Sequence, residues 1–279
     1  MTLPQTMTQI EITQPGGPEV LQPNQVPVPT PEAGEILIRV HAAGVNRPDV
    51  IQRAGKYPMK PGMSPIPGLE VAGEVVAIGQ GVTEFILGDS VCALTNGGGY
   101  AQYCVAPASQ ALPIPQGMDW LQAAAVPETF FTVWANLFDL GGASQGQRAL
   151  IHGGTSGIGT TALMLCREFG IKAFATAGSE DKCAAIRKLG AEAINYREQD
   201  FVQVIQEKTA GKGVNVILDI MGGSYLNPNL AALGMDGRLV MLGFLGGAKA
   251  KDVDLMTILG KRATITGSLM RARTREEKA

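Results

Sequence analysis

Cysteine and charge are both scarce in this 279-residue chain, and each shortage excludes a class of protein. Its four cysteines stand far apart and form no Cys-x-x-Cys pair, so reduced, buried thiols are expected rather than a disulfide framework. Charged residues make up only 17% of the chain and the net charge is −2, which leaves no basic surface for nucleic acid or an anionic membrane. The composition therefore predicts neither a nucleic-acid-binding nor a membrane-binding protein.

A long uninterrupted apolar run and a basic N-terminal leader are also missing. The most apolar stretch with a helical pattern, residues 121–138, contains Pro127 and Glu128 and is not predicted to span a membrane. The first basic residue is Arg39, so no secretory signal is expected and the protein is predicted to be cytoplasmic. Hydrophobic residues make up 45% of the chain, and this length suffices for two globular domains.

The pattern of predicted secondary structure changes near residue 125. Before it, short strands at 35–40, 69–79 and 100–106 are separated by glycine and proline turns, which predicts a β-rich domain over 1–125. One helix is predicted over 121–142, ending at the Gly141–Gly142 pair. Beyond it, apolar runs alternate with helical segments, which is typical of a doubly wound parallel sheet over 126–267. These runs lie at 149–154, 172–178, 214–220, 238–243 and 263–268.

A glycine-rich turn follows the first of these runs. Because Gly154, Gly157 and Gly159 lack a Cβ, the backbone can approach a pyrophosphate where the next helix begins. Ser156 stands where the standard fingerprint has its middle glycine, and its hydroxyl could bond cofactor or substrate. The same letters fit the turn of short-chain reductases, but no tyrosine precedes a lysine by four residues, as those enzymes require. A dinucleotide site is predicted, with a plain structural turn as the alternative.

The end of the second parallel strand indicates NADPH rather than NADH. Ala177, Gly178 and Ser179 place no carboxylate where an NAD site usually bonds the ribose 2′-hydroxyl. Lys182 follows within one helical turn and is a cation suited to a phosphate. The alternative interpretation of Lys182 is a solvated residue on a helix surface.

Many ordered segments together resemble the zinc-free quinone oxidoreductases of the medium-chain dehydrogenase/reductase superfamily, in the branch of the tumour-suppressor-inducible quinone oxidoreductase. They include NRPDVIQRAGKYP (46–58), GLEVAGEVVAIG (68–79), GGGYAQYCVAP (97–107) and LIHGGTSGIGTTALMLCREFG (150–170). The resemblance implies an α/β protein with a GroES-like β-rich catalytic domain followed by a Rossmann domain, usually in a homodimer. It also implies hydride transfer from NADPH to a quinone.

The resemblance also assigns site residues. Asn46 and Tyr57 match family positions at which we expect hydrogen bonds to the quinone oxygen, with Tyr57 or water supplying the proton. Ser156 matches the serine of the family's glycine turn and is counted with the catalytic candidates. By the same matching, Ser179, Lys182 and Tyr196 are expected to hold the 2′-phosphate, while Thr132, Phe244 and Leu245 border the nicotinamide. Alternatively, Asn46 and Tyr57 are a turn residue and a loop residue beside Pro48 and Pro58.

Zinc ligands are not expected. Leu69 stands where zinc-dependent relatives carry a histidine, and Asn46 stands where they carry the catalytic cysteine. The cysteine-rich structural zinc lobe is missing as well. His41 and His152, the two histidines of the chain, cannot complete a tetrahedral set from separate motifs.

The family's C-terminal return to the first domain is expected to be only begun in this chain, over residues 268–279, with the remainder missing. Dimer contacts are expected at the sheet edge near residues 238–247. Two alternatives to a quinone reductase stay open. One is an NADPH-dependent reductase of enone or alkenal double bonds, and the other is a truncated, non-catalytic NADPH-binding protein.

Overall fold

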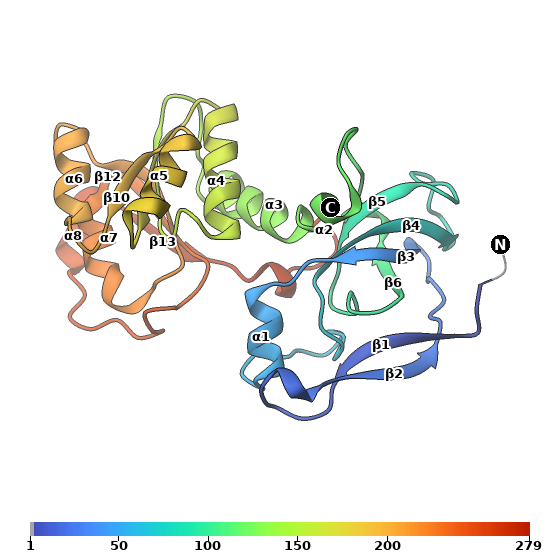
Figure 1. Ribbon diagram of the computed structural model, residues 1–279. Helices are drawn as coiled ribbons and strands as arrows, with labels where there is room; N and C mark the ends of the chain where they lie inside the picture. Colours follow the sequence, from blue (N-terminus) through green and yellow to red (C-terminus); the bar gives the residue numbers. More distant parts are fainter. Residues whose placement is uncertain (1–2) are drawn as a thin grey trace. The chain divides into compact units, whose positions relative to one another are not determined.

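The computed structural model describes residues 3–279 and separates into two compact units (Figure 1). The first unit comprises the chain up to Phe131 together with Met270–Ala279, and the second comprises Thr132–Leu269. Among the described residues, no helix combines the length and the apolar character needed to cross a membrane.

The first unit is built on a five-stranded antiparallel sheet in the order β6-β3-β4-β5-β7. Its strands are β3 (Glu35–Ala43), β4 (Glu70–Ile78), β5 (Ser90–Leu94), β6 (Tyr103–Pro107) and β7 (Ala111–Pro113). Ile36 and Ile38 of β3 enter the main core with Val71 and Val75 of β4, as the period-two pattern predicts. The predicted strands at 35–40, 69–79 and 100–106 are confirmed as β3, β4 and β6.

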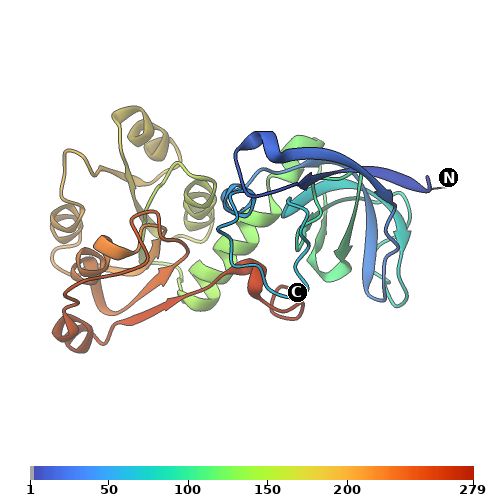
Figure 2. The same cartoon turned by 90° about the horizontal axis from the view of Figure 1, so that it is seen from below.

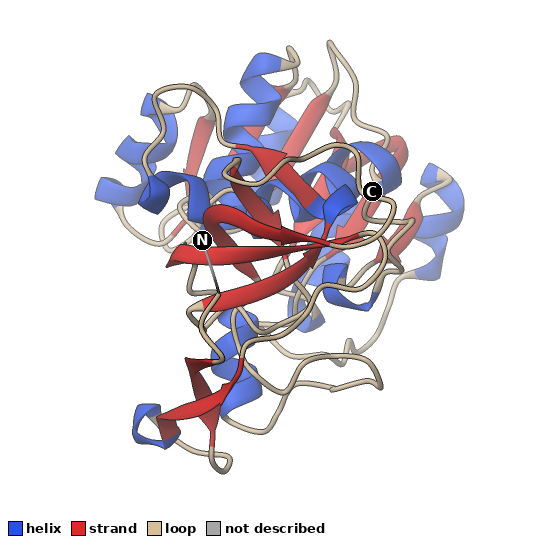
Figure 3. Ribbon diagram, turned by 90° about the vertical axis from the view of Figure 1, so that its right-hand side faces the viewer, coloured by secondary structure: helices blue, strands red, loops and turns tan. Residues whose placement is uncertain are grey.

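Shorter elements complete this unit. A two-stranded sheet pairs β1 (Thr6–Ile12) with β2 (Leu21–Pro27), and helix α1 (Arg47–Arg53) follows β3. Single turns of 3-10 helix lie at η1 (Pro18–Val20), η2 (Ala108–Gln110) and η5 (Met270–Ala272). Figure 3 shows the strands in red and the helices in blue.

The single helix predicted over 121–142 is wrong. The segment forms α2 (Trp120–Ala124), α3 (Pro127–Val133) and the π-helical segment η3 (Trp134–Leu140). Pro127 lacks an N–H and disfavours helical geometry at the residue before it, so α2 ends at Ala124. The same proline is tolerated at the start of α3, where an N–H has no partner within the helix. The predicted end before Gly141 is confirmed.

The second unit holds a six-stranded parallel sheet in the order β10-β9-β8-β11-β12-β13. Its strands are β8 (Arg148–Ile151), β9 (Lys172–Ala177), β10 (Glu192–Asn195), β11 (Val214–Asp219), β12 (Leu233–Met241) and β13 (Thr264–Gly267). Register places Phe174, Leu150, Ile217 and Leu239 in one row across four strands, and all four are fully buried. The parallel sheet predicted from unbroken apolar runs is confirmed.

Helices connect these strands and surround the sheet (Figure 2). They are α4 (Gly157–Glu168), α5 (Glu180–Lys188), α6 (Phe201–Lys208), α7 (Leu226–Ala232) and α8 (Leu255–Lys261), with the 3-10 turn η4 (Gly223–Tyr225) before α7. Strand order reverses between β8 and β11, and ligands of such sheets bind outside the carboxyl ends of strands at this kind of switch point. The sheet edge expected near 238–247 lies one strand further along, at β13, because β12 is paired on both sides.

Candidate nucleotide and substrate residues

Ser156 holds the glycine turn between β8 and α4. As the N-cap residue of α4, its hydroxyl oxygen accepts a hydrogen bond from the Gly159 N–H at 3.0 Å. The same hydroxyl donates to the Gly153 carbonyl oxygen at 2.8 Å. Both bonds stabilise the turn itself, so Ser156 has a structural role whatever it contacts in a complex.

Two glycines of this turn stand where a side chain has no room. A Cβ on Gly154 would lie 2.7 Å from the Cβ of Ala175 on β9, and a Cβ on Gly159 would lie 2.6 Å from the Gly154 carbonyl carbon. Gly157, at the first position of α4, is exposed. The turn therefore brings an exposed helix N-terminus to the carboxyl end of β8, which is a favourable position for an anion.

Three predicted phosphate-site residues follow β9 and β10. A Cβ on Gly178 would lie 2.6 Å from the Tyr196 hydroxyl, so the phenol lies across the end of β9. Ser179 is the N-cap residue of α5, but its side chain makes no capping bond and its hydroxyl is available to a ligand. Lys182 is exposed on α5, and within residues 3–279 it takes part in no ion pair. The side chains of Ser179, Lys182 and Tyr196 thus follow the carboxyl ends of β9 and β10.

The loop after β12 carries two of the three predicted nicotinamide neighbours, Phe244 and Leu245. The Leu245 N–H donates to the Ile220 carbonyl oxygen at 3.0 Å, which ties this loop to the one after β11. A Cβ on Gly222 would lie 2.6 Å from the Phe244 ring, and the side chains of Phe244 and Leu245 are both exposed. The hydroxyl oxygen of Thr132, which lies in α3, is buried and has no hydrogen-bond partner among residues 3–279. All the predicted nucleotide residues belong to the second unit.

His152 lies directly before the glycine turn but acts inside the core. Its Nε2 is 2.7 Å from the Asn229 Oδ1 and its Nδ1 is 3.1 Å from the Thr176 Oγ1. Burial lowers the pKa of His152, so the ring is neutral and joins β8 to β9 and α7.

Asn46, in the first unit, turns its side chain toward β4. Its Nδ2 donates to the Oε1 of Glu70 at 2.7 Å, and the Oε2 of Glu70 accepts from the Glu128 N–H at 2.8 Å. Glu70 is 3% exposed, and this burial raises its pKa above the ordinary value, although the two hydrogen bonds act in the opposite direction. One buried carboxylate therefore links Asn46 to the start of α3.

Tyr57 lies against Arg271, which belongs to the C-terminal segment of the first unit. The guanidinium carbon is 5.2 Å from the centre of the Tyr57 ring. Arg271 is 6% exposed and donates to the Gln52 Oε1 at 2.7 Å and to the Ser64 carbonyl oxygen at 2.9 Å. Burial is the largest influence on Tyr57 and raises its pKa, so its phenol is a neutral donor near pH 7.

Sequence analysis did not single out three acidic residues, of which Glu70 and Asp49 form hydrogen bonds with Asn46. Asp49 accepts from the Gly68 N–H and from the Asn46 N–H, each at 2.9 Å. Burial raises the pKa of Glu128 to about 8, and the negative charges of Glu70 and Asp49 add to this effect. Glu70 was within reach of sequence analysis, since it follows Leu69 in a segment already compared with a zinc motif. Glu128 offered no comparable signal.

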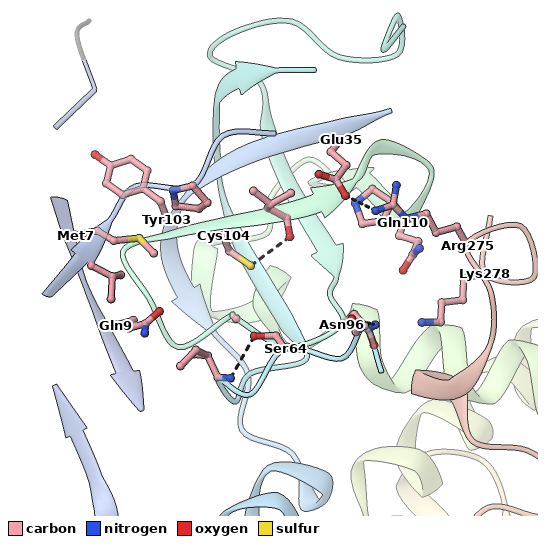
Figure 4. A pocket seen from close by; sticks show the side chains of 18 of the residues that line it. Met7, Gln9, Glu35, Ser64, Asn96, Tyr103, Cys104, Gln110, Arg275 and Lys278 are labelled. Atoms are coloured by element: carbon pink, nitrogen blue, oxygen red, sulfur yellow. Dashed lines mark hydrogen bonds and ion pairs between the residues drawn. The ribbon is translucent and has the colours of Figure 1, made fainter. Parts of the chain in front are cut away.

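A cavity of about 560 Å³ lies elsewhere in the first unit. Figure 4 shows the Lys278 side chain extending toward it, with Asn96 and Ser64 on its wall and Arg275 paired with Glu35. None of the site residues predicted from the sequence lines this cavity.

Two family models match the N-terminal and the C-terminal parts of the chain separately. The family model described as "Alcohol dehydrogenase GroES-like domain" matches residues 32–116, and "Zinc-binding dehydrogenase" matches residues 157–279. The quinone oxidoreductase of the rat (Rattus norvegicus) is 34% identical over 274 residues, which cover 97% of this chain and 82% of the relative.

Solved structures give two further similarities. A mycobacterial protein in complex with NADPH superposes with a TM-score of 0.84 at 30% identity, covering 98% of this chain and 85% of that one. The CurK enoyl reductase superposes with a TM-score of 0.83 at 28% identity, covering 95% and 81%. These matches confirm the resemblance predicted from the sequence. The chain therefore belongs to the medium-chain dehydrogenase/reductase superfamily, in which it is an oxidoreductase related to the quinone oxidoreductases.

Proposed function

We propose that this chain is a quinone reductase that uses NADPH and needs no zinc. The observation that carries the cofactor assignment is the end of β9, where the Ser179 hydroxyl and the Lys182 ammonium have no partner among the described residues and no carboxylate stands at the strand tip. An acid there would favour the 2′-hydroxyl of NADH, whereas a hydroxyl and an ammonium suit a 2′-phosphate. The mycobacterial neighbour in complex with NADPH supports the same choice.

NADPH fits the groups that the second unit presents. Its pyrophosphate would lie at the N-terminus of α4, where the tight packing of Gly154 and Gly159 keeps the backbone clear of side chains. The 2′-phosphate would be held by Ser179, Lys182 and Tyr196, and the nicotinamide by Thr132, Phe244 and Leu245. The unpartnered Thr132 hydroxyl would then gain a partner. When bound, NADPH supplies the hydride.

The donor atoms of the first unit do not fit zinc. Leu69 is apolar and 1% exposed, and the Asn46 amide nitrogen is directed at Glu70. His41 stacks on Trp120 with ring centres 4.5 Å apart. Among residues 3–279, no group of three or more His, Cys, Asp or Glu side chains is placed to hold a metal ion. Polarisation of the acceptor carbonyl is therefore assigned to N–H and O–H donors.

Asn46 and Tyr57 are the proposed donors. One Nδ2 hydrogen of Asn46 is used by Glu70, and the second remains for a carbonyl oxygen. The Tyr57 phenol stays protonated because burial raises its pKa. Both groups would stabilise the negative charge that develops on the oxygen as hydride arrives.

The cofactor assignment is tested by Lys182→Ala, with Lys188→Ala on the same helix as the matched control. Fluorescence titration should show NADPH affinity falling about tenfold in Lys182→Ala, in line with a lost charge-assisted hydrogen bond. NADH affinity should stay unchanged, and Lys188→Ala should bind both nucleotides like the parent. A Lys182→Ala protein that keeps its full preference for NADPH would exclude this phosphate site.

Reduction of an enone or alkenal double bond is the second candidate, because the CurK enoyl reductase is among the structural neighbours. The same amide and phenol would polarise the carbonyl of such a substrate. Parallel turnover assays on a quinone and on an alkenal separate the two activities. Nucleotide that binds but is oxidised by neither acceptor would indicate a non-catalytic protein.

A homodimer formed through the second unit accompanies this proposal. Strand β13 is an edge strand of the described sheet and offers unpaired backbone groups. Leu255, Met256 and Leu259 of the preceding helix α8 are each at least 70% exposed. Such a group of apolar side chains beside a sheet edge suits a second copy of this unit.

A further inference from the structure

The Asn46 side chain has a partner beyond the helix that it begins. Asn46 is the N-cap residue of α1, where an asparagine normally accepts a hydrogen bond from the helix backbone. Here the Asp49 carboxylate accepts from the Asn46 N–H as part of a capping box, and the carboxamide nitrogen of Asn46 donates to Glu70. The carboxamide of this N-cap residue thus also reaches a carboxylate on β4.

Glu70 determines which way the carboxamide faces. Both of its oxygens accept hydrogen bonds from N–H donors, Asn46 Nδ2 at 2.7 Å and Glu128 N at 2.8 Å, which is the pattern of an ionised carboxylate. A carboxylate only accepts hydrogen bonds, so the neighbouring amide must present its nitrogen and not its oxygen. The second Nδ2 hydrogen and the Oδ1 of Asn46 are then directed away from Glu70.

The burial of Glu70 is energetically unfavourable, and a purely structural role does not account for it. It is 3% exposed, and no lysine or arginine of the described chain forms an ion pair with it. A buried carboxylate without a cationic partner is unfavourable, and a neutral amide could brace the same two elements at less cost. A carboxylate is needed here if the residue at position 70 must accept both hydrogen bonds and donate none.

We propose that Glu70 is a positioning residue, which holds the Asn46 carboxamide so that its second Nδ2 hydrogen is presented to the carbonyl oxygen of the acceptor. The inference rests on the proposed function only in its last step, the contact with the acceptor. The orientation of Asn46 by Glu70 stands on the first unit alone. The Glu128 N–H completes the arrangement by fixing the second carboxylate oxygen from α3.

Glu70→Gln tests this role because it preserves shape while it replaces one acceptor by a donor. The carboxamide introduced by this substitution can accept from Asn46 or from the Glu128 N–H, but its NH₂ group then faces the other donor. Turnover number with a quinone should fall at least tenfold, while the KM for NADPH, whose site lies in the second unit, should stay within twofold. Glu74→Gln, on the same strand and paired with Arg39, is the matched control and should turn over like the parent.

Nuclear magnetic resonance of the Asn46 side-chain NH₂ group distinguishes a Glu70 that orients Asn46 from a Glu70 that only stabilises the fold. In the parent, the Nδ2 proton that is bound to the Glu70 carboxylate should lie downfield of its position in a solvated asparagine, and Glu70→Gln should shift it upfield. If turnover in Glu70→Gln stays within twofold of the parent, or if the Asn46 resonances do not move, the inference is wrong. If the parent reduces neither a quinone nor an alkenal, the proposed function fails instead, and the resonance shift alone decides whether Glu70 orients Asn46.

Discussion

Two serines in equivalent positions are predicted to differ in how much stability the protein loses when the hydroxyl is removed. Ser156 and Ser179 each occupy the N-cap position of a helix that follows a parallel strand. The Ser156 hydroxyl accepts from the Gly159 N–H and donates to the Gly153 carbonyl oxygen, whereas the Ser179 hydroxyl makes no capping bond. Ser156→Ala therefore removes two hydrogen bonds, and Ser179→Ala removes none within the protein.

The expected loss of stability in Ser156→Ala follows from these two hydrogen bonds. Loss of a serine N-cap costs about 1 kcal/mol, and the bond to Gly153 adds roughly 0.5–1 kcal/mol. Ser156→Ala should therefore lower the free energy of unfolding of the second unit by about 1.5–2 kcal/mol. This corresponds to a decrease of roughly 5 °C in the midpoint of thermal unfolding. Ser179→Ala should stay within about 0.5 kcal/mol of the parent, as expected for a side chain with no native partner.

Urea unfolding followed by tryptophan fluorescence measures the change in the unfolding free energy of the second unit. Trp134 belongs to the second unit and Trp120 to the first, so a Trp120→Phe background leaves Trp134 as the sole tryptophan reporter. Nucleotide titration of the same proteins supplies the second readout. Ser179→Ala should weaken NADPH relative to NADH, whereas Ser156→Ala should weaken both nucleotides alike.

The reasoning is refuted if Ser156→Ala unfolds at the parent's urea midpoint. It is equally refuted if Ser179→Ala loses more stability than Ser156→Ala, because the hydrogen bonds described would then not be those that hold the two turns. A Ser179→Ala protein with unchanged stability and an unchanged NADPH preference would leave the capping argument intact and contradict only the phosphate contact.

Two further predictions concern pH and assembly. Because the folded-state pKa of Glu128 is about 8 and its ordinary value is 4.5, the folded protein holds this proton more tightly, and the contribution of Glu128 to stability falls as pH rises between the two values. Thermal unfolding of Glu128→Gln should therefore match the parent near pH ~4.5 and exceed it near pH ~9; an equal difference at both values would contradict the assignment. Leu259→Glu should disrupt the proposed dimer and shift sedimentation to the monomer, while Lys249→Glu, in an exposed loop of the same unit, should not.

Local signals predicted the second unit well because its strands are defined by short apolar runs. The run ending at Ile151, followed directly by the glycine turn, predicts strand, turn and helix in that order, and β8 and α4 follow it. Pro127 also carries a local signal, the missing N–H, whereas the apolar pattern continues through the region and favours one helix. The predicted helix consequently ran across the break between α2 and α3.

The candidate site was only partly accessible from the sequence. Asn46, Tyr57 and Ser156 were proposed from motifs, yet the hydrogen-bond partners of Asn46 and Ser156 were not foreseen. Arg271 meets the Gln52 side chain across 219 residues of chain, and no periodicity or spacing predicts such a contact. The same holds for the Glu128 N–H on Glu70, which joins a helix start to a strand 58 residues earlier.

By itself, the sequence determined the division into a β-rich and a parallel-sheet unit, and the place of the glycine turn. These features depend on side-chain period and on glycine and proline, which act over a few residues. The tertiary structure alone decided that Ser156 is committed to its own turn while Ser179 is free, and that a buried Glu70 directs the Asn46 amide. Such choices depend on which donors and acceptors packing brings within 3 Å, and burial makes each unmet partner costly enough to select one arrangement.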